Sequence, residues 1–359
     1  MMLGESMNSV IDMKKYGLSD YFLELSKNFG GLLISRIILQ EKGLYRIVSN
    51  QGEKMAEISG KFRYNALSVS DFPAVGDFVM VDCNEHGGNA VIQQVLSRRS
   101  CFTRKGAGEG RQEQVVAANI DTVFLCMSLN NDFNIRRLER YLSIAWDGGA
   151  TPVVVLTKSD LCEDLNEKLS EVSAVAMGVE ILVTTAIKQD GYKQILPFIS
   201  EGETVAFIGS SGVGKSTLIN CLLGEERLYT NGLRNDDKGR HTTTHRELFL
   251  LNSGMVIDTP GMRELGMWDN STGVEKAFSD IEELAKQCRF RDCTHSGEPG
   301  CAICQAIESG ELDTERWRSY QKLKAESAYA EDSESYIAVK EKRYKEIAKI
   351  NKTNKRIKR

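Results

Sequence analysis

The clearest chemical signal in the sequence is a glycine-rich stretch that fits the pattern G-x-x-x-x-G-K-[ST]. It consists of Gly209, Ser210, Ser211, Gly212, Val213, Gly214, Lys215 and Ser216, with Thr217 directly after it. Such glycines let backbone N–H groups curve around a phosphate, and the start of the following helix adds partial positive charge. Lys215 would reach the β- and γ-phosphates, and Ser216 would hold Mg²⁺. A glycine-rich turn is the alternative, but the stretch lies between an expected buried strand and an expected helix, where this motif belongs.

The tetrapeptide Asp258-Thr259-Pro260-Gly261 is a second candidate, about fifty residues after the start of the phosphate loop. It follows the apolar run GMVI, which is typical of a strand. An Asp at a strand end can bind Mg²⁺ through water, and the N–H of Gly261 can reach a γ-phosphate. Alone, DTPG indicates a turn, but its position relative to the phosphate loop favours a nucleoside triphosphatase.

A polar loop, NDDKGRHTTTHRE (235–247), lies between these two motifs. One threonine of the run 242–244 could complete the coordination of Mg²⁺ and release the ion after hydrolysis, as switch loops do. An ordinary flexible loop would have the same composition, so the sequence leaves both interpretations open.

The stretch Thr157, Lys158, Ser159 and Asp160 resembles the tetrapeptide with which GTPases read guanine. It follows the apolar run PVVVL, and ligands bind at the carboxyl ends of parallel strands. Asp160 could accept hydrogen bonds from guanine N1–H and N2–H₂, a pair that adenine does not offer, and the Lys158 stem could cover the base plane. Alternatively, TKSD is an [ST]-x-x-[DE] helix start.

A further candidate for base reading is the end of the next expected strand, where Thr185 and Ala186 could offer a backbone N–H to guanine O6. These base-reading residues precede the phosphate loop, whereas in ordinary GTPases they follow it. Cutting a domain at one loop and joining its nearby ends elsewhere preserves every spatial contact. The sequence therefore predicts a circularly permuted GTPase that binds GTP and GDP.

A cysteine cluster lies near the C-terminus, in the order Cys288-x₄-Cys293-x-His295-x₅-Cys301. Three thiolates and one imidazole meet the tetrahedral demand of a structural Zn²⁺. No open ligand position is evident, so we expect one structural ion per chain. Cys304 could replace Cys301 as the fourth ligand, and free buried cysteines beside a surface histidine are the alternative to a metal site.

Around these motifs the sequence indicates three folded parts. Apolar and alternating runs from Gly31 to about Ser97, separated by turn signals, predict about five strands and a small OB-type β-barrel. From Asn119, buried strands alternate with helices, which indicates a parallel α/β sheet covered on both faces. The expected segments are a weakly ordered extension 1–28, the OB-fold domain 29–100, a mobile basic linker 101–118, the circularly permuted GTPase domain 119–272, and a helical zinc-binding domain with a basic tail 273–359.

The composition, 41 % hydrophobic and 27 % charged, is that of a soluble globular protein. No apolar run reaches the eighteen or so residues of a membrane helix, and the N-terminus lacks the order of a secretion signal. We therefore expect a cytoplasmic protein with no membrane partner. The net charge is −4, yet residues 338–359 carry ten Lys and Arg against two Glu, a local excess of +8. Such an end suits an RNA phosphate surface or a solubilising, frayed tail.

The order TKSD, GSSGVGKST, GRHTTT, DTPG and the cysteine cluster resembles the ribosome small subunit-dependent GTPase A family, RsgA, also called YjeQ or YloQ. The phrases FPAVGD and AANID are similar as well, so the resemblance covers about residues 30–325. It implies an N-terminal OB domain, a permuted GTPase domain and a C-terminal zinc domain. It also implies a monomeric partner of the 30S ribosomal subunit and its 16S rRNA, which hydrolyses GTP there and acts late in maturation.

The resemblance also implies individual roles. Lys215 and Ser216 match the phosphate and Mg²⁺ residues, Thr243 matches the switch threonine that joins the Mg²⁺ shell, and His241 is similar to a histidine proposed to assist hydrolysis. Met262 follows DTPG where many GTPases keep a glutamine, so another group must orient water. His241 as loop filler remains the alternative. Thr157 stands where the family pattern has Asn, which would leave guanine selectivity more dependent on Asp160.

Two other classes of function remain open at this point. One is a nucleic-acid-binding protein with a vestigial nucleotide site, against which the intact Lys215, Ser216 and Asp258 argue. The other is an ATP-dependent enzyme in which TKSD is only a helix start.

Overall fold

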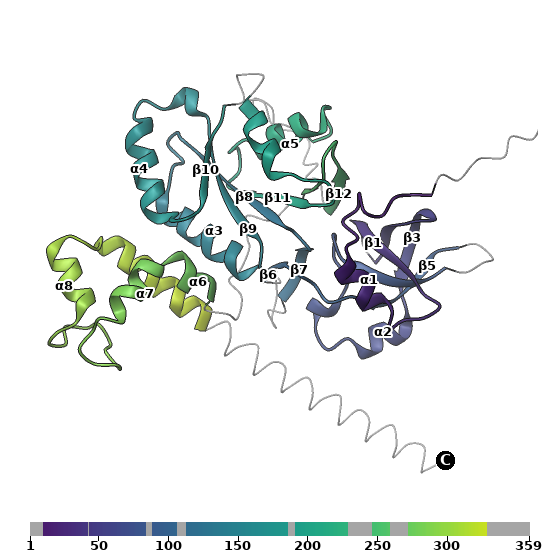
Figure 1. The fold of residues 1–359 in the computed structure, drawn as a ribbon, viewed down its shortest axis with the longest axis horizontal. Coiled ribbons are helices and arrows are strands. Elements are labelled where there is room, and N and C mark those ends of the chain that lie inside the picture. Colours follow the sequence, from purple (N-terminus) through teal and green to yellow (C-terminus); the bar gives the residue numbers. More distant parts are fainter. Residues whose placement is uncertain are drawn as a thin grey trace, which may run out of the picture.

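The protein is described by a computed structural model that covers residues 10–41, 43–83, 88–105, 113–185, 191–228, 246–258 and 272–328. Figure 1 shows three parts: a barrel, a central sheet flanked by helices, and a helical C-terminal part that packs against the central one. No helix in the described ranges combines the length and the apolar character that a bilayer crossing requires.

The N-terminal part is a closed five-stranded barrel, as the sequence predicts. The strands pair in the order β1-β2-β3-β5-β4, and β4 pairs back onto β1 to close the barrel. A short helix, α2 (Gly60–Asn65), lies between the third and fourth strands, which is the arrangement of an OB fold. The strands are β1 (Leu33–Gln40), β2 (Tyr45–Ser49), β3 (Gly52–Ile58), β4 (Phe78–Asp82) and β5 (Ala90–Val95).

The expectation of a weakly ordered extension is wrong for the described residues 10–28. Helix α1 (Asp20–Ser26) buries Phe22 completely, and its ring lies 4.1 Å from that of Phe78 in the barrel. The fully buried Arg36 of β1 donates to the carbonyl of Tyr16 at 2.7 Å and to Thr204 Oγ1 at 2.8 Å in the central sheet. These contacts are long-range, so the local composition of the extension gave no sign of them.

The expectation of a mobile linker is also wrong for the residues that the structure describes there. β6 (Cys101–Lys105) and β7 (Glu113–Ala118) pair as an antiparallel hairpin. Phe102, Val115 and Val116 are buried, because this pair of strands packs between the barrel and the central sheet (Figure 1). The hairpin is therefore part of the junction between the two parts.

The central part is a sheet in which β10, β9, β8, β11 and β13 lie in that order and run parallel, with β12 antiparallel beyond β13. Alternate residues of each strand face opposite sides. Val154 and Leu156 pack on the side of α3 and α4, whereas Val153 and Val155 pack on the side of α5. The elements are β8 (Thr122–Ser128), β9 (Thr151–Thr157), β10 (Glu180–Val183), β11 (Thr204–Gly209), β12 (Arg246–Leu250), β13 (Met255–Asp258), α3 (Ile135–Asp147), α4 (Leu165–Val175) and α5 (Lys215–Leu223).

The barrel and the central sheet share backbone pairing. β12 pairs antiparallel with β1, so that Leu39 opposes Glu247 and Gln40 opposes Arg246. The largely buried Arg246 also donates to the carbonyl of Val115 in β7, at 3.0 Å. The result is one continuous sheet that runs from the central part into the barrel.

The C-terminal part packs on α3. It contains α6 (Thr272–Ala277), α7 (Ser279–Ala285), α8 (Ala302–Ser309) and helical residues 314–328. Arg316 joins Glu139 of α3, at 2.9 Å, to Asp280 of α7, at 2.7 Å. Because Glu139 is fully buried, loss of Arg316 would leave its carboxylate with Arg136 as ion-pair partner and would weaken this junction. The basic residues 338–359 lie outside the described ranges.

A second contact ties α3 to α6, the first described element after Asp258. Asp147 Oδ1 accepts a hydrogen bond from the backbone N–H of Gly273 at 2.6 Å. A Cβ at Gly273 would lie 2.2 Å from that oxygen, so only glycine fits there. Burial raises the pKa of the Asp147 carboxyl to about 7, and the Gly273 bond and the Lys276 ammonium oppose that rise.

Candidate functional site

The candidate site lies along the carboxyl edge of the central sheet. The register aligns Thr157 of β9 with Ser128 of β8, and Cys126 of β8 with Gly209 of β11. The segments that follow β10, β9, β11 and β13 therefore emerge at one edge, in that order. The base-reading strand and the phosphate strand are two strand spacings apart, about 10 Å, a span that a guanosine nucleotide can bridge. The described parts of the reordered motifs thus lie side by side in space.

The phosphate loop joins β11 to α5 and has the backbone that its glycines predict. Gly212 and Gly214 have φ values of 73° and 106°, in the left-handed region that disfavours other residues. Helix α5 begins at Lys215, so its first N–H groups open toward the loop. The Lys215 Nζ donates to the carbonyls of Gly209 and Ser210, each at 2.7 Å. These features fit a bound phosphate chain.

Asp258 ends β13 on the other side of the phosphate loop. Burial raises the pKa of its carboxyl, the Lys215 ammonium opposes that rise, and Glu247 on the neighbouring strand adds to it. A divalent cation would stabilise the ionised form of such a carboxyl. Asp258 and Ser216 both offer oxygen atoms, the ligands that Mg²⁺ prefers, and their binding of this ion stays a prediction.

The base-reading candidates also lie together. The Asp160 carboxylate accepts a hydrogen bond from the Thr185 hydroxyl, and the backbone N–H of Ser159 donates to the carbonyl of Thr184 at 3.3 Å. TKSD is not the start of the next α-helix, because Ser159–Leu161 form a single 3₁₀ turn and α4 begins at Leu165. The helix-start alternative is therefore wrong.

Thr157 has a contact that the sequence did not suggest. Its buried hydroxyl donates to the carbonyl of Val213 in the phosphate loop, at 2.6 Å. A threonine in the position of the usual asparagine thus ties the base-reading strand to the phosphate loop. The expectation that Thr157 itself contacts guanine stays a prediction.

Asp132 belongs to no motif, yet it lies at the same edge, in the segment after β8. Its carboxylate accepts a hydrogen bond from the Ser210 hydroxyl of the phosphate loop and from Arg137 Nη1 at 2.8 Å. The Ser210 bond is the main reason that the pKa of Asp132 is lowered. Only its place after a central parallel strand could have pointed to it from the sequence.

Four predicted site residues lie outside the described ranges. They are Ala186, His241, Thr243 and Gly261. Their proposed roles in base reading, hydrolysis, Mg²⁺ binding and γ-phosphate contact stay predictions. The described residues of the site flank the segments that contain them.

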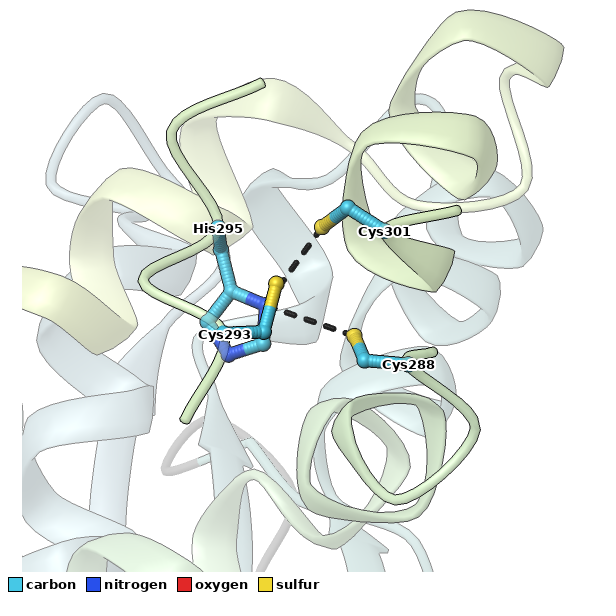
Figure 2. A group of neighbouring side chains, drawn as sticks. All are labelled: Cys288, Cys293, His295 and Cys301. Carbon is cyan, nitrogen blue, oxygen red and sulfur yellow. Dashed lines mark hydrogen bonds between the residues drawn. The ribbon is translucent and has the colours of Figure 1, made fainter. Parts of the chain in front are cut away.

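The predicted metal ligands converge in the C-terminal part. The ligand atoms of Cys288, Cys293, His295 and Cys301 all lie within 4.8 Å of one another (Figure 2). His295 Nδ1 is 3.5 Å from the sulfurs of both Cys288 and Cys301. Ligand atoms of a tetrahedral zinc site are separated by about 3.5 to 4 Å, so this cluster fits Zn²⁺ with little adjustment.

Cys304 lies beside the cluster, not in it. Its backbone N–H approaches the Cys301 sulfur at 3.5 Å, and its own thiol points to the carbonyl of His295 at 3.7 Å. Such an N–H stabilises a metal-bound thiolate. The geometry therefore favours Cys301 over Cys304 as the fourth ligand.

Comparison with known proteins agrees with this geometry. Residues 95–268 match the family model described as RsgA GTPase. The chain is 48 % identical over 322 residues to "Small ribosomal subunit biogenesis GTPase RsgA 2" of Lactiplantibacillus plantarum, covering 89 % of this chain and 90 % of that protein. The chain belongs to the RsgA GTPase family. A second RsgA relative, from Oceanobacillus iheyensis, is 43 % identical and covers 90 % of this chain and 93 % of its own.

Solved structures of RsgA-type proteins share the fold. The crystal structure of YjeQ from Thermotoga maritima matches with a TM-score of 0.61 and 26 % identity, covering 81 % of this chain and 97 % of that one. The structure titled "YloQ, a circularly permuted GTPase" matches with a TM-score of 0.58 and 25 % identity, covering 84 % and 96 %. The predicted family and permuted GTPase fold are thereby confirmed.

Proposed function

We propose that this protein hydrolyses GTP on the small (30S) ribosomal subunit and acts late in the maturation of that subunit. Membership of the RsgA GTPase family carries this proposal, because the curated relatives are named for small ribosomal subunit biogenesis. The order of Asp160, Lys215 and Asp258 along one sheet edge supports it from the structure.

The described residues have separate roles in nucleotide binding and hydrolysis. Asp160 reads the guanine N1–H and N2–H₂, while the loop amides and Lys215 hold the phosphates. To do so, the Lys215 ammonium leaves the carbonyls of Gly209 and Ser210 for phosphate oxygens, which carry more negative charge. Ser216 and Asp258 would hold Mg²⁺, which neutralises charge on the transferred phosphoryl group when it is bound.

Hydrolysis would be communicated through the elements at the two ends of the site. Only His245 separates residues 242–244 from β12, which pairs with β1 of the barrel. The chain after Asp258 leads to α6, which Asp147 holds against α3. Loss of the γ-phosphate would change both segments and shift the domains that face the ribosome.

The finer assignments follow from the same proposal. The basic residues 338–359 and the OB barrel would contact 16S rRNA, since both kinds of surface suit RNA phosphates. Zn²⁺ would hold the segment from Cys288 to Cys301, and the protein would act as a cytoplasmic monomer. His241 would assist hydrolysis, because the thioether of Met262 cannot orient water.

Nucleotide hydrolysis with and without purified small subunits tests this function. We expect slow hydrolysis of GTP by the full chain alone, at least about tenfold faster hydrolysis with small subunits, and little hydrolysis of ATP in either case. Large subunits serve as the matched control. Equal rates with small and large subunits, or a preference for ATP, would refute the proposal.

A further inference from the structure

The side chain of Asp132, in the segment between β8 and α3, contacts the phosphate loop. The Ser210 hydroxyl donates to Asp132 Oδ2, and Arg137 of α3 donates to the same oxygen at 2.8 Å. Ser210 is the second residue of the loop, directly after the end of β11. Asp132 therefore reaches the loop where it leaves the sheet.

Asp132 is held in place from its own strand. Asn130 Oδ1 accepts hydrogen bonds from the Ser128 hydroxyl at 2.8 Å and from the backbone N–H of Asp132 at 3.1 Å. These bonds fix the turn that follows β8, and Arg137 fixes the carboxylate at its end. The Asp132–Ser210 contact thus links two rigid elements, the end of β8 and the start of the phosphate loop.

The Asp132–Ser210 contact would matter most to the shape of the phosphate loop when a nucleotide binds. In the structure, the Lys215 ammonium holds the carbonyl of Ser210 at 2.7 Å. A phosphate chain draws that ammonium away, because phosphate oxygens carry more negative charge than a carbonyl. The bond from Ser210 to Asp132 uses the hydroxyl and not the carbonyl, so it would remain when the ammonium leaves and would keep the loop open.

The negative charge of Asp132 does not make it a group that repels the phosphates, because cations lie beside it. Arg137 pairs with it directly, and the positive charge of Lys158 also lowers its pKa. Its carboxylate is thus partly neutralised from two sides, one of them the base-reading segment. A hydrogen bond from a hydroxyl to such a carboxylate is stronger than one between neutral groups.

We propose that Asp132 is a nucleotide-positioning residue, which holds Ser210 so that the phosphate loop keeps its binding shape when Lys215 turns to the phosphates. This inference rests on the proposed binding of GTP and GDP by this site. It assigns Asp132 no contact with the nucleotide itself.

Titration of the full chain with mant-GDP tests the inference. We expect Asp132→Ala and Ser210→Ala each to weaken binding roughly tenfold, mainly through faster dissociation. The double variant should be no weaker than either single variant, because both remove the same bond. Asp132→Asn, whose amide oxygen still accepts from Ser210, should stay within about threefold of the wild type. Asp82→Ala, an exposed carboxylate in the barrel, is the matched control.

The outcomes separate this inference from the proposed function. Unchanged or tighter binding by Asp132→Ala, or losses that add in the double variant, would overturn the role of Asp132 while the function stands. A wild-type chain that does not bind mant-GDP would instead contradict the function. A general loss of structure would lower the melting temperature of Asp132→Ala and would not produce the non-additivity with Ser210→Ala.

Discussion

Replacement of Lys215 by alanine is expected to lower GTP hydrolysis by at least about a hundredfold. In the structure its ammonium lies on the phosphate loop, bound to the carbonyls of Gly209 and Ser210. It is a cation placed where the β- and γ-phosphates would lie, and negative charge develops there during transfer. No other cation in the described part of the loop can take its place, since Lys215 is the only Lys or Arg between 209 and 216.

Steady-state hydrolysis with small subunits present measures this effect. Lys215→Arg should rescue little of the activity, because a guanidinium has different reach and geometry from an ammonium. Lys286→Ala, on the exposed end of α7, is the control and should behave as the wild type. A Lys215→Ala variant within threefold of the wild-type rate would show that the loop does not serve hydrolysis.

Loss of the zinc ligands is expected to produce the largest change in stability. Between Cys288 and Cys301 the chain has only turns and bends, so backbone pairing contributes little to its shape. Structural zinc sites supply roughly 10–16 kcal/mol of binding free energy in small peptides, and such binding is coupled to folding. We expect about one zinc per chain in the wild type, and little zinc in Cys293→Ser or Cys301→Ser. Cys304→Ser, one turn of helix away, should keep the metal.

Tryptophan fluorescence can follow the loss of zinc in the full chain. The Trp317 ring is edge-on to His295, with the ring centres 5.6 Å apart. A chelator should therefore change the Trp317 emission and lower the melting temperature, and zinc should restore both. Trp317→Phe identifies the contribution of this residue. Zinc retained by Cys301→Ser and lost by Cys304→Ser would reverse the ligand assignment.

Much of the architecture could be predicted from the sequence, because it depends on local patterns. The continuous apolar run PVVVL predicts a strand buried on both faces. Asn134 begins α3, with its side chain accepting from the N–H of Arg137. The order of the motifs predicted the permutation, and the spacing of cysteines predicted the metal cluster. Each of these signals lies within a few residues.

The parts that could not be predicted depend on contacts between distant segments. The pairing of β1 with β12 and the burial of Arg36 join residues about 170 or more positions apart. The hydroxyls of Thr157 and Ser210 bind partners that share no motif with them. The stretch 101–118 has the composition of a linker, and only neighbours in space make residues 101–105 and 113–118 paired strands. Such contacts require the fold to be known first.

The central claim is that Asp160 and Lys215 act on one guanine nucleotide, and Asp160→Asn tests it most directly. An asparagine can still accept from Thr185, so the local geometry should persist, but it cannot accept from both guanine donors. We expect the affinity of this variant for GTP to fall at least about a hundredfold. Its affinity for xanthosine triphosphate should rise above its affinity for GTP. Hydrolysis of xanthosine triphosphate by this variant should still require Lys215. If Asp160→Asn kept its preference for GTP over xanthosine triphosphate, Asp160 would not read the base and the account would be contradicted.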